Sequence, residues 1–173
     1  MEKVYDIAMI VLPSLIVFLT AFYTIKGFLE NEQKKRLLEL RKDGQKLLTP
    51  IRLQAYERAA MFLERISPDT LITRVHKNGM SARKLQSELL KSIRDEFNHN
   101  LSQQIYMSDQ AWFRVKSAKE EMIKLFNLAS SRLNDDATGI DLSKIILQLT
   151  LNIEKLPTQS ALEYIKKEIR QSF

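Results

Sequence analysis

The stretch SDQAWFRVKSAKEEMIKLFNLASSRL, residues 108–133, decides the fold class of this chain. Apolar side chains recur along it at steps of three and four residues, which is the period of an α-helix with one face in a core. Ser108 precedes the first of them, where a hydroxyl can accept a hydrogen bond from a free amide at a helix start. The stretch therefore predicts a long core helix. The periodic positions are Ala111, Trp112, Val115, Ala118, Met122, Leu125, Phe126, Ala129 and Leu133.

The segments on either side of this helix are also helical in pattern. Upstream, Ser81 is expected to cap a long helix, and a short helix that starts at Pro68 is expected to end at Asn78-Gly79. Downstream, residues 140–156 are so densely apolar that they fit a buried helix or, less well, a strand. A last amphipathic helix follows. The chain has only four Gly and four Pro, which favours helices over sheets.

The pair Thr49-Pro50 predicts the start of another helix, because threonine is a good N-cap and proline fits the first helical position. Apolar residues recur at helical spacing from there to Ile66. Residues 49–173 are thus expected to form an all-α bundle of five or six antiparallel helices.

Residues 7–25 read IAMIVLPSLIVFLTAFYTI, nineteen residues without a charge. A helix of that length reaches about 28 Å, close to the roughly 30 Å thickness of a bilayer's hydrocarbon core. A buried core helix seldom has so long an apolar run, and a cleaved signal peptide needs a basic start and a small-residue cleavage site that the sequence lacks. We expect residues 1–29 to be a single transmembrane anchor.

Basic residues follow this anchor, whereas Lys3 alone precedes it. The positive-inside rule then places the N-terminus outside and the rest of the chain in the cytoplasm. Residues 30–48 are rich in helix formers and are expected to form a basic stalk helix with a thin leucine stripe. The candidate contacts with anionic lipid are Lys26, Lys34, Lys35, Arg36, Arg41 and Lys42.

The charge balance favours an anionic partner without identifying it. The chain has 27 basic and 21 acidic residues, and only two of the basic and three of the acidic ones lie in residues 1–31. The remainder is therefore basic, which suits lipid headgroups, nucleic acid or acidic protein surfaces. Cysteine is absent, so disulfides, thiolate nucleophiles and cysteine-ligated metal centres are excluded.

The clearest candidate for catalytic chemistry is Glu96-x-x-His99, a spacing that places a carboxylate and an imidazole on one helix face. A di-iron site needs a second such motif, and His76 has Thr73 rather than an acid three residues before it. Phosphate-binding glycine loops and nucleophile elbows are absent from the sequence. We expect no cofactor, metal or small-molecule substrate and no enzyme activity.

Two stretches combine polar residues with aromatic ones, QAYERAAMFLER at 54–65 and NHNLSQQIYMSDQAW at 98–112. Such clusters either end a helix or make specific hydrogen bonds across an interface. The candidate partner surface consists of Arg52, Tyr56, Glu57, Arg65, Asn98, His99, Asn100, Gln103, Gln104 and Tyr106.

The segments PIRLQAYERAAMFLERISP (50–68) and EFNHNLSQQIYMS (96–108) resemble a family of short, single-span, uncharacterised bacterial membrane proteins. The resemblance implies an inner-membrane location with a cytoplasmic helical domain, and it supplies no activity. Together with the anchor, it favours an accessory or scaffold subunit that binds a larger membrane protein complex. The alternative is a membrane tether for nucleic acid, the ribosome or acidic lipid.

Overall fold

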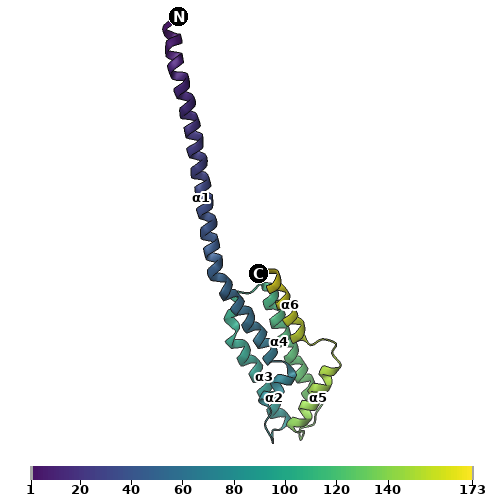
Figure 1. Cartoon of the computed structure of the whole chain (residues 1–173). Coiled ribbons are helices and arrows are strands. Elements are labelled where there is room, and N and C mark those ends of the chain that lie inside the picture. Colours follow the sequence, from purple (N-terminus) through teal and green to yellow (C-terminus); the bar gives the residue numbers. More distant parts are fainter. Residues whose placement is uncertain (1, 173) are drawn as a thin grey trace. The chain divides into compact units, whose positions relative to one another are not determined.

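A computed structural model describes the backbone of residues 2–172 and the side chains of residues 9, 14–40, 42 and 44–171. Over this part of the chain the protein is all-α, as the periodicity predicts (Figure 1). The elements are α1 (Glu2–Arg65), α2 (Pro68–Val75), α3 (Ala82–His99), the 3-10 helix η1 (Leu101–Ile105), α4 (Asp109–Ser130), α5 (Gly139–Leu151) and α6 (Pro157–Ser172).

The chain divides into two compact units, Met1–Thr49 and Pro50–Phe173. The first consists of the N-terminal part of α1, and the second contains the remaining helices. The prediction that a new helix begins at Thr49-Pro50 is wrong, because α1 continues through both residues. Strong helix formers on either side keep the helix intact, although proline cannot donate one of its hydrogen bonds.

Among the residues whose side chains are described, no helix has a segment both long and apolar enough to cross a bilayer. The span expected at residues 7–25 includes residues 7, 8 and 10–13, which lie outside those side chains. The anchor therefore stays a prediction.

The core of the second unit is built around α4, which packs against α3, α5 and α6 (Figure 1). The periodic side chains of residues 108–133 are buried, except that Leu125 and Leu133 are half-buried. A row of aromatic rings links α1, α3 and α4: Phe62 lies 5.7 Å from Phe97, which stacks on Trp112 at 5.4 Å between ring centres. The sequence pattern thus identifies the core.

Polar caps set the starts of the central helices. The Ser108 hydroxyl oxygen accepts a hydrogen bond from the Ala111 amide at 3.0 Å, and that of Ser81 accepts one from the Lys84 amide at 3.3 Å. Both caps are as predicted. Residues 139–151 are a helix rather than a strand, and it ends at Leu151, before the predicted end at residue 156.

The starts of α3 and α5 are joined by a clasp, which we define as the backbone contacts between residues 80–82 and 137–139. The Ala82 amide donates to the Ala137 carbonyl at 2.9 Å, and the Gly139 amide donates to the Met80 carbonyl at 2.7 Å. Helix α2 ends at Val75, earlier than predicted, although Gly79 does take a left-handed conformation at φ 80°. The two backbone segments of the clasp lie close together, because a β-carbon on Gly139 would be only 3.0 Å from the Met80 carbonyl oxygen.

Candidate functional site

A groove in the second unit lies between the last turns of α1 and the last turn of α3. Its volume is about 480 Å³. Three arginine or histidine side chains, one carboxylate and one exposed methionine border it, and a buried phenylalanine lies beneath. The lining residues are Arg58, Met61, Phe62, Arg65, Glu96, His99 and Asn100.

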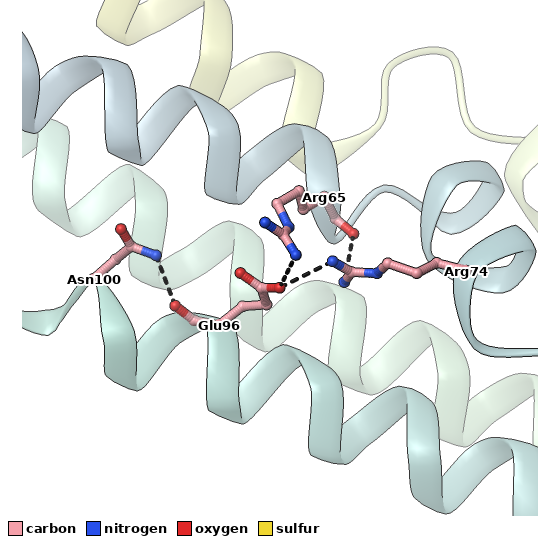
Figure 2. A network of polar contacts seen from close by, with 4 residues as sticks. All are labelled: Arg65, Arg74, Glu96 and Asn100. Atoms are coloured by element: carbon pink, nitrogen blue, oxygen red, sulfur yellow. Dashed lines mark hydrogen bonds and ion pairs between the residues drawn. The ribbon is translucent and has the colours of Figure 1, made fainter.

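Glu96 is the centre of the polar contacts in this groove (Figure 2). Its Oε1 lies 2.7 Å from Arg65 Nη2 and 2.9 Å from Arg74 Nη1. The Glu96 side chain is 19% exposed, so the ion pairs are partly shielded from water. One carboxylate therefore links three helices, because Arg65 ends α1, Arg74 lies in α2 and Glu96 lies in α3.

Two backbone contacts position the same cluster (Figure 2). Asn100 caps the end of α3, and its amide group donates to the Glu96 carbonyl at 2.8 Å. Arg74 Nη2 donates to the Arg65 carbonyl at 3.4 Å, which satisfies a free carbonyl at the end of α1. The run Asn98–Asn100 is poor in helix propensity, which explains why α3 ends beside the groove.

The groove carries a net positive charge. Two arginines line it, Arg58 and Arg65, against a single acidic residue, Glu96. Arg58 is exposed and makes no ion pair with any described side chain. Beside these charges, Met61 is 59% exposed. The groove thus combines an available guanidinium with an exposed apolar side chain.

The structure brings together three of the ten residues predicted for the partner surface, namely Arg65, His99 and Asn100. Six others are exposed or half-buried but do not line the groove. They are Arg52, Glu57, Asn98, Gln103, Gln104 and Tyr106. Tyr106 packs partly against the core, and Gln103 donates to Ser102 Oγ at 3.3 Å.

The prediction that Tyr56 belongs to the partner surface is wrong, because this residue is only 2% exposed. Its hydroxyl donates to Glu168 Oε1 at 2.5 Å and accepts the Ser108 amide at 3.3 Å. Ser108 Oγ also donates to Glu168, at 2.9 Å to Oε2. Burial, together with the hydrogen bond to the Glu168 carboxylate, raises the pKa of Tyr56. Tyr56 therefore joins α1, α4 and α6 inside the unit.

Three residues in or beside the groove were not predicted from the sequence. Arg58 and Met61 belong with Arg65 at steps of three and four residues, a spacing that could have identified them. No local pattern indicates Arg74, because the folding of α2 against α3 brings it to Glu96.

Glu96 and His99 both line the groove, but the Glu96 carboxylate is held by two arginines. No group of three or more His, Asp or Glu side chains that could hold a metal ion occurs within the described residues.

The predicted lipid contacts all lie in the first unit. Lys26, Lys34, Lys35, Arg36 and Lys42 are all exposed, and the side chain of Arg41 lies outside the described residues. Arg36 Nη2 is 3.6 Å from Glu32 Oε1, a pair exposed enough to be weak.

One family matches nearly the whole chain. The match is to a family of unknown function, DUF7935, and it extends over residues 2–172. No curated protein and no solved structure matches the chain.

Proposed function

Because this chain belongs to DUF7935, a family of unknown function, we propose its role from its own residues. The protein is a non-catalytic, membrane-anchored accessory or scaffold subunit. Its helical unit binds a partner protein complex at the cytoplasmic face of a bacterial inner membrane. The anchor supplies location, and the groove of the second unit supplies the contact.

The anchor rests on the uncharged run at residues 7–25 and on the basic residues that follow it. A run of this length is sufficient for one crossing, and the asymmetry of lysine and arginine orients it with the helical unit inside. The bacterial location rests on the resemblance of residues 50–68 and 96–108 to single-span bacterial proteins.

The observation that carries the partner-binding role is the composition of the groove. Glu96 is used to hold Arg65 and Arg74, so it acts as an ion-pair partner rather than as an acid or base. Arg58 and Met61 remain exposed beside it. Arginine and methionine are enriched where proteins bind one another, and a few such residues provide most of the binding energy.

The test is capture of the partner from native membranes. A photo-crosslinking amino acid replaces Met61 in the full chain, which is then purified in mild detergent after irradiation. A defined membrane protein should be crosslinked at this position and not when the same group replaces Arg132, an exposed residue outside the groove. Recovery of the chain as a monomer without any crosslinked protein contradicts the proposal.

The orientation is tested separately with single cysteines, which the absence of natural cysteine makes simple. In intact cells, a membrane-impermeant maleimide should react with Lys3→Cys and not with Ser131→Cys. Both should react after the membrane is opened. Labelling of Ser131→Cys in intact cells refutes the cytoplasmic location of the helical unit.

The second candidate function is a tether for an anionic partner, supported by the exposed lysines of the basic stalk at residues 30–48. Juxtamembrane lysines and arginines each add about 1 kcal/mol to binding of an anionic leaflet. This function predicts that replacing Lys34 and Lys35 by glutamine weakens vesicle binding and that added salt does the same. A protein contact at the groove should be unaffected by these two replacements.

A further inference from the structure

One face of α1 in the second unit is exposed and regularly spaced. It consists of Ile51, Gln54, Arg58, Met61 and Arg65, separated by steps of three, four, three and four residues. We propose that this face, called here the α1 face, binds an acidic amphipathic helix of the partner protein. The inference deepens the proposed function, on which it rests, by naming the chemistry of the partner.

The spacing indicates a helical occupant. Alternating steps of three and four average 3.5 residues, the repeat by which two helices keep one seam in contact over several turns. The adjoining side of the same segment contributes Ala55, Ala59 and Phe62 to the core. The core therefore does not require the α1 face, which is available along its length for a second helix.

The charges on the α1 face indicate that the occupant is acidic. Arg58 makes no ion pair with any described side chain, and Arg65 is 47% exposed and shares its single carboxylate with Arg74. A guanidinium offers paired N–H groups that fit a carboxylate in a fork-like geometry. Arg58 and Arg65 lie seven residues apart, about 10.5 Å along the helix axis, so two glutamates two turns apart on a partner helix would match them.

Apolar contact completes the seam. Met61 lies between the two arginines and is 59% exposed, and Ile51 is 41% exposed. Methionine is flexible and polarizable, so it can adapt to the aliphatic side chain of a partner. A partner side chain that covers Met61 excludes water from the neighbouring ion pairs, and the attraction within these pairs becomes stronger. The occupant is thus a helix with leucine-like residues between its acids.

The same charges disfavour a second copy of this chain. In a parallel pair of copies, Arg58 would face Arg58 and Arg65 would face Arg65. Like charges opposite each other at seam positions are destabilising, and natural coiled coils use them to exclude wrong partners.

Nucleic acid is also disfavoured at this face. Single-stranded nucleic acid binds best where aromatic rings can stack on its bases. Of the two rings that line the groove, Phe62 is 1% exposed and His99 offers a single imidazole, so successive bases would find no row of rings to stack on.

The test uses the full chain in nanodiscs of phosphatidylcholine and a fluorescent helical peptide as probe. The probe carries leucine along its seam and glutamate at two seam positions seven residues apart, and a matched control peptide has glutamine at both. Fluorescence anisotropy should show at least tenfold tighter binding of the glutamate peptide. The variant Arg58→Glu should weaken that binding at least tenfold, whereas Arg132→Gln should leave it unchanged.

Exchanging the charges of the chain and the probe shows whether Arg58→Glu loses binding only because the variant unfolds. A probe with lysine in place of the glutamate that faces residue 58 should bind Arg58→Glu better than it binds the unaltered chain. Equal binding of the glutamate and glutamine peptides overturns the inference. So does competition by an oligonucleotide or the formation of a dimer through the α1 face, seen as crosslinks between copies at Met61.

Failure of this inference can be told apart from failure of the proposed function. If native membranes yield a partner that crosslinks at Phe113 or Leu151, which are exposed elsewhere on the unit, the scaffold role holds and the α1 face is not its contact. If the glutamate peptide binds but no partner is captured at any position, the chemistry of the α1 face holds and the scaffold role fails.

Discussion

Removing one hydroxyl group, in Tyr56→Phe, should destabilise the helical unit by about 2 kcal/mol. This hydroxyl donates to a carboxylate at 2.5 Å, and hydrogen bonds to charged groups contribute about 1.5–3 kcal/mol each. It also accepts the Ser108 amide at 3.3 Å, a longer and weaker bond. The carboxylate of Glu168 keeps its hydrogen bond from Ser108 Oγ in the variant, which limits the loss.

The assay is urea unfolding of the full chain in detergent micelles, followed by fluorescence. The chain has one tryptophan, Trp112, which is 8% exposed and stacks on Phe97, so its emission reports the packing of the second unit. At a urea dependence of roughly 1–3 kcal/mol per M, a 2 kcal/mol loss lowers the midpoint by about 1 M. The matched control is Tyr164→Phe, which removes an exposed hydroxyl that donates to Gln110.

A double-mutant cycle decides whether the stability comes from this contact. Glu168→Gln alone should also be destabilising, and the combination with Tyr56→Phe should cost less than the sum of the two single variants, because both remove the same bond. If Tyr56→Phe costs no more than Tyr164→Phe, or if the two effects add fully, the hydroxyl does not hold α1 to α6 in the way described.

Burial raises the pKa of Tyr56, so the Tyr56 hydroxyl keeps its proton to higher pH in the folded state than in the unfolded state. The stabilisation from this hydroxyl is therefore present below about pH 10 and is lost as pH rises through the folded-state pKa. In the same urea assay, the unaltered chain should lose stability above pH 10 more steeply than Tyr56→Phe. Gly139→Ala should lower the free energy of unfolding by about 1–3 kcal/mol, because the added methyl group would lie 3.0 Å from the Met80 carbonyl oxygen and 3.2 Å from the His76 ring. An unchanged urea midpoint would show that the clasp accommodates the methyl group without strain. Glu96→Gln should lower the free energy of unfolding by about 1 kcal/mol, since both arginines that pair with Glu96 are partly exposed. The same variant should bind the glutamate peptide more tightly, because Arg65 is released from its ion pair. Weaker binding would mean that Glu96 orders the α1 face rather than competing with the peptide for Arg65.

Periodicity and capping predict much of the fold because they act locally. Ser81 and Ser108 begin helices where the sequence places a hydroxyl before an apolar repeat. The Thr49-Pro50 signal failed for an equally local reason, since the helix formers on both sides outweigh one proline. The end of α2 was misplaced because Gly79 takes part in the turn after the helix rather than in its cap.

The candidate site was less predictable because it depends on contacts between distant segments. Arg65, His99 and Asn100 were found, since polar residues near helix ends are visible in the sequence. Arg74 reaches Glu96 only after α2 folds onto α3. Tyr56 looks like an interface aromatic in sequence, and only the positions of Ser108 and Glu168 explain why a polar ring is buried there.

The clasp also bears on the order in which the second unit folds. It joins Ser81 to Thr138, which are 57 residues apart in the chain, with α3, η1 and α4 between them. Bringing such distant residues together carries a loop-closure cost that local helix formation does not, so contacts of this kind tend to form after their intervening helices. Closing the clasp would then be a late event that fixes the start of α5 against helices already in place.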